Sequence, residues 1–207
     1  VLGLLGMFVL RLRHEIRGPE SVYPVAMALL ALVYIPVLFG AFTIRLAALP
    51  LGVEGLDDPG RSGIWLAFLV ILTAKFTDMG AYLVGSLIGK HKAIPHISPA
   101  KSWEGYLGSL LFAQGGALGV YYLGRGAGGE DPFGWIGSTF HIVVLAFLIA
   151  LAAMLGDLAE SVLKRSLKVK DSGSMLPGIG GIMDLVDSLC FAVPVAFIYC
   201  HLLVNVL

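Results

Sequence analysis

The chain has 207 residues, of which 57% are hydrophobic and 14% are charged, and its 14 basic and 14 acidic residues give a formal net charge of zero. Soluble domains contain about 45–50% apolar and about 25% charged residues, and a globule of this size still exposes much of its surface. The composition therefore excludes an ordinary soluble domain and predicts that lipid surrounds much of the chain. The balanced charge gives no indication of nucleic-acid binding.

Hydrophobic runs predict the membrane topology. A helix needs about 20 mostly apolar residues to cross a bilayer, and five runs meet this condition: 22–44, 63–88, 105–123, 139–156 and 182–205. The run at 105–123 is rich in small residues, which let membrane helices approach closely, so we expect it to serve packing rather than chemistry. The predicted fold class is all-α: a polytopic integral membrane protein whose residues 1–207 form a single membrane domain.

The first residues have the character of an incomplete span. The apolar run at 1–10 begins with Val1 and is followed by Arg11 and Arg13, an order opposite to that of a signal peptide. We therefore expect a truncated N-terminal helix in addition to about five full spans, and the sequence to be a fragment that lacks N-terminal helices.

The basic residues divide unequally between the two sides of these spans. Segments 11–20, 89–104 and 157–181 alternate with the loops of the opposite side and carry ten Lys and Arg residues. The opposite side carries Arg45, Arg61 and Arg125. Because basic residues accumulate on the cytoplasmic side of membrane proteins, the ten-charge face is predicted to be cytoplasmic, at the inner or plasma membrane.

Acidic residues gather at two span ends on this same face. If the helix at 139–156 continues, Asp157, Glu160, Ser161 and Lys164 lie on one of its faces. Asp184 and Asp187 share a face where the last span begins. Carboxylates that are packed closely repel one another unless a cation lies between them, and Mg²⁺ prefers such oxygen ligands together with substrate phosphates. The pattern predicts a Mg²⁺ site.

The segment between these two helices suits an anion. It is basic at first and then rich in Gly and Ser. Lys and Arg bind phosphate oxygens, and glycines let backbone N–H groups approach an anion. The candidate phosphate-binding residues of this region are Lys164, Arg165, Lys170, Asp171, Ser172, Gly178, Gly180 and Gly181, together with Ser161 on the helix.

A second segment carries similar chemistry. Asp78 lies inside the span at 63–88, too deep to cap a helix, and the polar segment that follows contains Ser98, Lys101 and Ser102. Each feature alone is typical of helix caps and of topology. Ionisable residues within a membrane are costly, however, and mark functional sites by default. We expect Asp78 to complete the ion site or to orient Lys101.

These two segments resemble the phosphatidate cytidylyltransferase family. The stretch from Ser161 to Asp187 resembles the family signature S-x-x-K-R-x4-K-D-S-G-x-x-L-P-G-x-G-G-x-x-D-x-x-D, and 78–82 and 98–105 resemble its other characteristic stretch. The resemblance covers roughly residues 77–190, the expected catalytic region. It departs at Ile179, where the family usually has His, and at Leu185, where it usually has Arg.

The resemblance implies a membrane enzyme that converts CTP and phosphatidate to CDP-diacylglycerol and pyrophosphate. It also implies a divalent ion such as Mg²⁺ with a monovalent ion such as K⁺ alongside, a homodimer, and a metal centre at Asp157 and Asp184. In this hypothesis Asp187, Glu160 and Asp78 are further ligands, and Lys101, Lys164, Arg165 and Lys170 neutralise the phosphates of CTP and phosphatidate.

Two other function classes suit part of the pattern. A CTP-dependent lipid-alcohol kinase, acting on polyprenol or phytol, needs the same metal and basic segment but releases CDP instead of pyrophosphate. An ion-coupled transporter requires acids distributed across the membrane depth and internal inverted repeats. The acids here crowd one face, and the sequence contains no internal repeat that we detect.

Overall fold

The computed structural model describes residues 26, 30, 33–53, 56, 58–95, 97–166 and 182–206, without the side chains of 182–185 and 206. Its elements are the π-helix η2 (Val33–Ala41), the helix α3 (Phe42–Ala48), the short helix η3 (Leu49–Gly52), α4 (Pro59–Ile88), the strands β1 (Lys92–Ile94) and β2 (Ser98–Ser102), α5 (Trp103–Gly126), the short helix η4 (Gly134–Ile136), α6 (Thr139–Ser166) and α7 (Ile182–Val206). The predicted truncated span at 1–10 lies outside these residues.

The predicted helical membrane architecture is confirmed. Within the described residues, four helical stretches are long and apolar enough to cross a membrane: Val33–Gly52, Pro59–Ile88, Thr139–Ser166 and Val186–Asn205. The predicted span at 105–123 forms α5, whose 24 residues suffice in length. It is not among those four stretches, since its glycines and polar side chains reduce its hydropathy.

Helix boundaries differ from the sequence prediction where a charge or a cap decides them. The first stretch continues beyond 44 to Gly52, because Arg45 stays at the surface while Leu46, 1% exposed, packs into the core. Helix α4 begins earlier than predicted, where the Asp58 carboxylate accepts a hydrogen bond from the Arg61 backbone N–H at 2.9 Å. Helix α6 continues ten residues beyond 156, so its polar face is helical as anticipated.

The segment after α4 was expected to be a polar loop and instead contains a β-hairpin. Strands β1 and β2 pair antiparallel, with Lys92 opposite Ser102 and Ile94 opposite Ser98. Ser102 then caps α5, because its Oγ accepts a hydrogen bond from the Gly105 N–H at 3.2 Å. The hairpin thus leads directly into a helix and holds β2 in a fixed relation to it.

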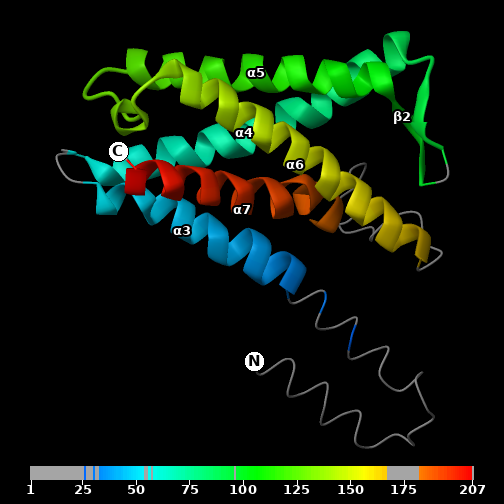
Figure 1. The fold of residues 1–207 in the computed structure, drawn as a ribbon, viewed down its shortest axis with the longest axis horizontal. Helices are drawn as coiled ribbons and strands as arrows, with labels where there is room; N and C mark the ends of the chain where they lie inside the picture. The colour runs from blue at the N-terminus through cyan, green and yellow to red at the C-terminus, as the bar shows by residue number, and fades with distance from the viewer. Residues whose placement is uncertain are drawn as a thin grey trace, which may run out of the picture.

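Glycines bring the helices close together. Helices α4 and α5 run antiparallel side by side (Figure 1), and a Cβ added at Gly108 would lie 2.4 Å from the Val84 side chain. One added at Gly80 would lie 2.8 Å from the Gly108 carbonyl oxygen. The same occurs between α6 and α7, where a Cβ at Gly156 would lie 2.5 Å from the Asp187 carbonyl oxygen. The expectation that small residues of 105–123 serve packing agrees with this geometry.

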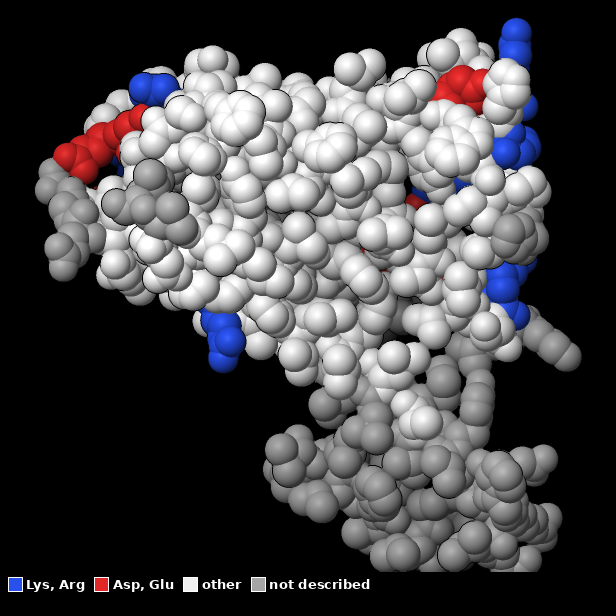
Figure 2. All heavy atoms as spheres, viewed as in Figure 1, with Lys and Arg blue, Asp and Glu red and all other residues white. Residues whose placement is uncertain are grey.

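The two ends of the bundle differ in character. The hairpin, the end of α6 and the beginning of α7 lie at the right-hand end in Figure 1, and the α5–α6 connection lies at the other end. Figure 2 shows mainly Lys and Arg side chains at the hairpin end, Asp and Glu together with a basic side chain at the other end, and a largely uncharged surface between them. The acidic residues predicted to cluster therefore emerge at the same end as the hairpin.

We expect Gly108→Ala to lower the thermal unfolding midpoint of the detergent-solubilised protein, because the added methyl group meets Val84 on α4. Overpacking of this kind costs about 1–3 kcal/mol. Gly119→Ala, on the same helix, is the matched control, since a Cβ there meets nothing within 4 Å. Equal midpoints for the two variants would contradict the close packing of α4 against α5.

Candidate active site

Helix α6 provides one side of the candidate site. Asp157, Glu160 and Lys164 lie on one face of this helix, and Glu160 is only 3% exposed. The Lys164 Nζ forms an ion pair with Glu160 Oε2 at 2.9 Å. Because Gly156 lets α7 pack directly against this part of α6, the acidic face of α6 lies against the first turns of α7.

Helix α7 brings a third carboxylate to this face. Asp187 is 7% exposed, and one of its oxygens accepts a hydrogen bond from the Ser188 backbone N–H at 2.6 Å. Carboxylate oxygens of Asp157, Glu160 and Asp187 all lie within 4.8 Å of one another. Three hard oxygen donors at this spacing fit a divalent cation such as Mg²⁺. These residues would hold the ion.

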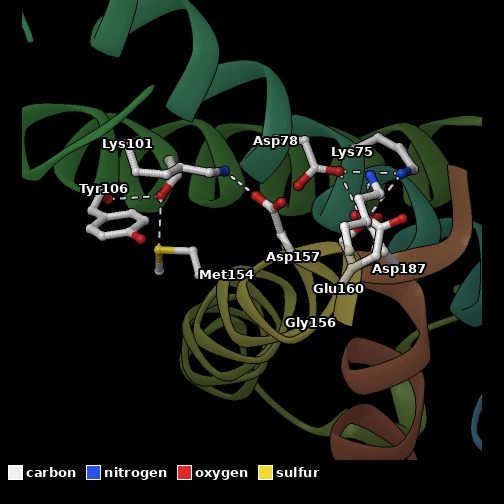
Figure 3. A network of polar contacts seen from close by, with 12 residues as sticks. Lys75, Asp78, Lys101, Tyr106, Met154, Gly156, Asp157, Glu160 and Asp187 are labelled. Atoms are coloured by element: carbon white, nitrogen blue, oxygen red, sulfur yellow. Dashed lines mark hydrogen bonds and ion pairs between the residues drawn. The ribbon is translucent and has the colours of Figure 1, made fainter. Parts of the chain in front are cut away.

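Helix α4 adds a fourth carboxylate with its own cation. The Lys75 Nζ lies 3.2 Å from Asp78 Oδ2 and donates a hydrogen bond to Ser188 Oγ, also at 3.2 Å. Ser188 Oγ in turn donates to Asp78 Oδ2 at 2.9 Å. Ser188 is fully buried. This triangle of contacts joins α4 to α7 beside the carboxylate cluster (Figure 3).

The hairpin brings a lysine onto the cluster from outside the helices. Lys101 on β2 forms an ion pair with Asp157 on α6 (Figure 3). Burial opposes the charge of this lysine, but the adjacent Asp157 carboxylate outweighs burial and raises the pKa of Lys101 above its usual value. Lys101 therefore remains a cation at neutral pH.

A second contact holds the hairpin to α5. Glu104 accepts hydrogen bonds from the His91 backbone N–H at 3.3 Å, and its carboxylate lies 2.5 Å from His91 Nδ1. Hydrogen bonding from the His91 side chain lowers the pKa of Glu104 to about 2. The Trp103 backbone N–H also donates to the His91 carbonyl at 3.0 Å. These bonds fix the hairpin base, and with it the position of Lys101.

A cavity of about 700 Å³ connects these groups. It lies between the hairpin and the helix faces, and Asp78, Asp157 and Asp187 line it together with Lys92 and Lys101. Asp78 lies ten residues before the end of α4, and Asp157 lies nine before the end of α6. At ~1.5 Å per residue both carboxylates lie roughly 15 Å from the helix ends. The cavity therefore gives access to acids that lie well below the ends of these helices.

The structure brings several of the predicted site residues together and separates others. Asp78, Asp157, Glu160, Asp187, Lys101 and Lys164 are joined by the contacts above. Ser102 lines the cavity, but its hydroxyl caps α5. Half-buried Ser98 and Ser161 are not among the cavity-lining residues, and exposed Arg165 donates from Nε to the Ile97 carbonyl at 3.4 Å.

The remaining predictions concern residues that the structure does not describe. The side chain of Asp184 lies outside the described part of α7, as does that of Leu185. The segment between α6 and α7 lies outside it altogether, and with it Lys170, Asp171, Ser172, Gly178, Ile179, Gly180 and Gly181. Their proposed roles stay predictions.

Sequence reasoning overlooked two members of the network. Lys75 was assigned no role, although its position three residues before Asp78 is a spacing that brings helical side chains together. Ser188, directly after Asp187 in the sequence, was assigned no role either. Its contact with α4 depends on how the two helices pack, and no local pattern reports that.

An apolar helical bundle with a carboxylate cluster and lysines at one end defines a membrane protein suited to metal ions and phosphates. Comparison with known sequences agrees with this class. The model of the cytidylyltransferase family matches residues 2–203, and the chain belongs to this family.

Curated relatives carry a more particular name, phosphatidate cytidylyltransferase. The relative from Bacillus subtilis is 35% identical over 214 residues, which cover 95% of this chain and 74% of that protein. The relative from Mycobacterium leprae is 39% identical over 66% of this chain and 41% of its own length. The relative from Brucella suis is 37% identical over 77% of this chain and 55% of its own length. The chain thus spans from under half to three quarters of the length of these relatives.

We expect Asp157→Asn and Asp187→Asn each to weaken the binding of Mn²⁺, a spectroscopic substitute for Mg²⁺, by at least about tenfold, because each removes a charged oxygen donor. Binding is measured by electron paramagnetic resonance of free Mn²⁺ with the purified protein. Asp131→Asn is the control, since Asp131 pairs with Arg125 in the α5–α6 connection at the other end of the bundle. Unchanged Mn²⁺ affinity in both test variants would contradict the proposed metal site.

Proposed function

We propose that this chain carries the active site of a CTP:phosphatidate cytidylyltransferase, which forms CDP-diacylglycerol and pyrophosphate in phospholipid synthesis. The observation that carries the proposal is the group of three carboxylates from α6 and α7, with oxygens within 4.8 Å of one another, next to a cavity lined by lysines. The shared family and the printed name of the relatives support the choice of substrates. We also propose that the protein acts as a homodimer, as the resemblance implies.

The reaction requires little proton transfer. A phosphatidate oxygen, already ionised at neutral pH, attacks the α-phosphorus of CTP, a new P–O bond forms, and the bond to the β-phosphate breaks with its electron pair leaving on pyrophosphate. Bringing two polyanions together and stabilising the leaving group are the main difficulties, and positioning and electrostatics address both.

Each side chain of the site has a defined task in this proposal. Asp157, Glu160 and Asp187 hold the divalent ion, which supplies positive charge to the triphosphate when bound. Lys101 enters from the hairpin and neutralises phosphate oxygens at the cavity wall, with Lys92 nearby. Asp184, Lys164, Arg165 and Lys170 are proposed to contribute further ligands and charges. The metal is Mg²⁺, with K⁺ as the monovalent ion that the resemblance implies.

The membrane orientation follows from the basic residues. At the hairpin end the described residues include Lys90, Lys92, Lys101, Lys164 and Arg165, whereas Arg45, Arg61 and Arg125 lie in the predicted loops of the other side beside Asp58, Glu130 and Asp131. We propose that the hairpin end faces the cytoplasm, where CTP is made. The acyl chains of phosphatidate then stay in the bilayer and enter between helices.

Product analysis tests the reaction. The full-length protein is supplied with CTP labelled at the α-phosphate and with phosphatidate in detergent–phospholipid micelles. We expect the label to enter a lipid, with release of unlabelled pyrophosphate in equal amount. In a parallel reaction with a polyprenol in place of phosphatidate, release of labelled CDP with phosphorylation of the alcohol would favour the kinase class instead.

We expect Asp157→Asn and Lys101→Met each to lower kcat/KM in this assay by about 10² or more, since each removes a charge that acts on the phosphates. Asp131→Asn serves again as the control and retains wild-type rates. Near-wild-type rates in both Asp157→Asn and Lys101→Met would refute the assignment of this cavity as the active site.

Cysteine labelling tests the orientation. Lys90→Cys, exposed just after the end of α4, is expected to react with a membrane-impermeant maleimide only from the cytoplasmic side of sealed vesicles. Glu130→Cys, exposed in the α5–α6 connection, is expected to react only from the opposite side. The two native cysteines are buried and give a low background. The reversed labelling pattern would contradict the proposed cytoplasmic face.

A further inference from the structure

Lys75 is a partly buried cation on α4, with a side chain that is 34% exposed. It lies 13 residues before the end of α4, and at ~1.5 Å per residue this is roughly 20 Å from the hairpin end. An ionised side chain at such depth is costly unless it has partners of opposite charge or polarity. Its partners include Asp78 on the same helix and Ser188 on α7. These contacts account for the position of Lys75, to which the proposed reaction assigns no role.

The Lys75 contacts tie together two helices beside the carboxylate cluster. Ser188 Oγ accepts from Lys75 and donates to Asp78 (Figure 3), so the ammonium group, the hydroxyl and the carboxylate form a closed triangle. The backbone N–H of the same Ser188 donates to Asp187 Oδ1 at 2.6 Å. A displacement of Ser188 therefore shifts the Asp187 carboxylate, which takes part in the cluster. Lys75 is connected to that carboxylate through one intermediate residue.

The lysines that pair with the carboxylates differ in whether they line the cavity. Asp78 has Lys75, Asp157 has Lys101, and Glu160 has Lys164 as ion-pair partners. Lys101 comes from a hairpin at the cavity wall, where substrate phosphates are expected to compete for it. Lys75 is not among the cavity-lining residues, whereas its partner Asp78 is. Lys75 therefore compensates the charge of Asp78 without lining the cavity itself.

We propose that Lys75 is a positioning residue. Its ammonium group compensates the charge of Asp78 and, through Ser188, keeps the Asp187 carboxylate beside those of Asp157 and Glu160, where the three can bind the divalent ion. Asp78 then needs no cation from solution, although it lines the cavity. Removal of the ammonium group leaves a carboxylate at membrane depth without this partner, and an ion of matching size can enter through the cavity. The inference rests on the proposed metal site but not on the transferred group.

The test compares Lys75→Met with the wild-type full-length protein in detergent, without substrate. Thermal unfolding and Mn²⁺ binding are measured in ammonium chloride and in tetramethylammonium chloride at equal ionic strength, because tetramethylammonium has no N–H group to donate to Asp78 or Ser188. We expect the Lys75→Met midpoint to be higher in ammonium by about 3–5 °C. Its Mn²⁺ affinity is expected to fall about tenfold in tetramethylammonium and to recover in ammonium.

The controls separate a specific role from a loss of charge in general. Lys90→Met removes an exposed lysine near the same end and is expected to show the same midpoint difference between the two salts as the wild-type protein, whose proposed K⁺ site can also take ammonium. Lys75→Arg keeps the charge and is expected to retain Mn²⁺ binding in tetramethylammonium. A Lys75→Met protein that is destabilised equally in both salts, or that binds Mn²⁺ like the wild type, overturns the proposal.

A double variant keeps the proposal testable where Lys75→Met alone fails to fold. Lys75→Met combined with Asp78→Asn removes both charges of this partly buried ion pair, and replacing both members of such a pair is tolerated better than removing one. We expect this protein to fold and its midpoint difference between the two salts to match that of the wild type. A larger ammonium-specific stabilisation of the double variant would show that the ion acts elsewhere and would overturn the role assigned to Asp78 and Lys75. Failure of cytidylyl transfer in the product assay leaves these binding results unchanged, so the two proposals fail independently.

Discussion

The compensation of charge within an apolar bundle is the constraint on which the rest of this structure depends. Four carboxylates from three helices approach one another within the bundle, and two of them, Asp78 and Asp157, lie roughly 15 Å from the helix ends. An ionised group without a partner is strongly disfavoured there. Three lysines pair with three of them, and the fourth, Asp187, accepts from a backbone N–H. Because Lys101 lies on β2 of the hairpin, its ion pair with Asp157 also fixes the hairpin against α6.

Close backbone contact makes this charge arrangement possible. Lipid is as apolar as the side chains of the bundle, so helices associate in a membrane through packing and polar contacts rather than through the hydrophobic effect. Gly156 lets α7 approach α6 at the level of Asp157 and Asp187, and Gly80 and Gly108 do the same for α4 and α5. The residues that build the candidate site and those that hold the helices together are therefore neighbours, and substitutions in this region are expected to affect both.

The arrangement suits a reaction between two anions. The proposed divalent-ion ligands lie on α6 and α7, while Lys101, which lines the cavity, comes from the hairpin. A metal site with a separately supported cation would allow the two proposed substrates to be held in one cavity with their negative charge compensated. Membership of the cytidylyltransferase family agrees with such chemistry.

Much of this was determined by the sequence. The apolar runs predicted the ends of α4, α6 and α7 to within a few residues, except the end of α6, which continues ten residues further. The spacing of Asp157, Glu160 and Lys164 predicted their common face, because this spacing follows the period of a single helix. The alternation of basic and apolar segments predicted which loops share an end of the bundle. The motif stretches predicted the family, since they preserve residue type and spacing over more than half of the chain.

Only the tertiary structure decided which faces meet. The hairpin was not foreseen, because two short polar strands carry no hydrophobic alternation to mark them. Lys75 gave no local indication that it reaches Ser188 on α7, and Lys101 gave none that it pairs with Asp157, since each contact joins residues more than 50 positions apart. The period of a helix can be recognised from residues that are close in sequence. The contact between two helices depends instead on how closely their backbones approach, and here glycines such as Gly156 set that distance.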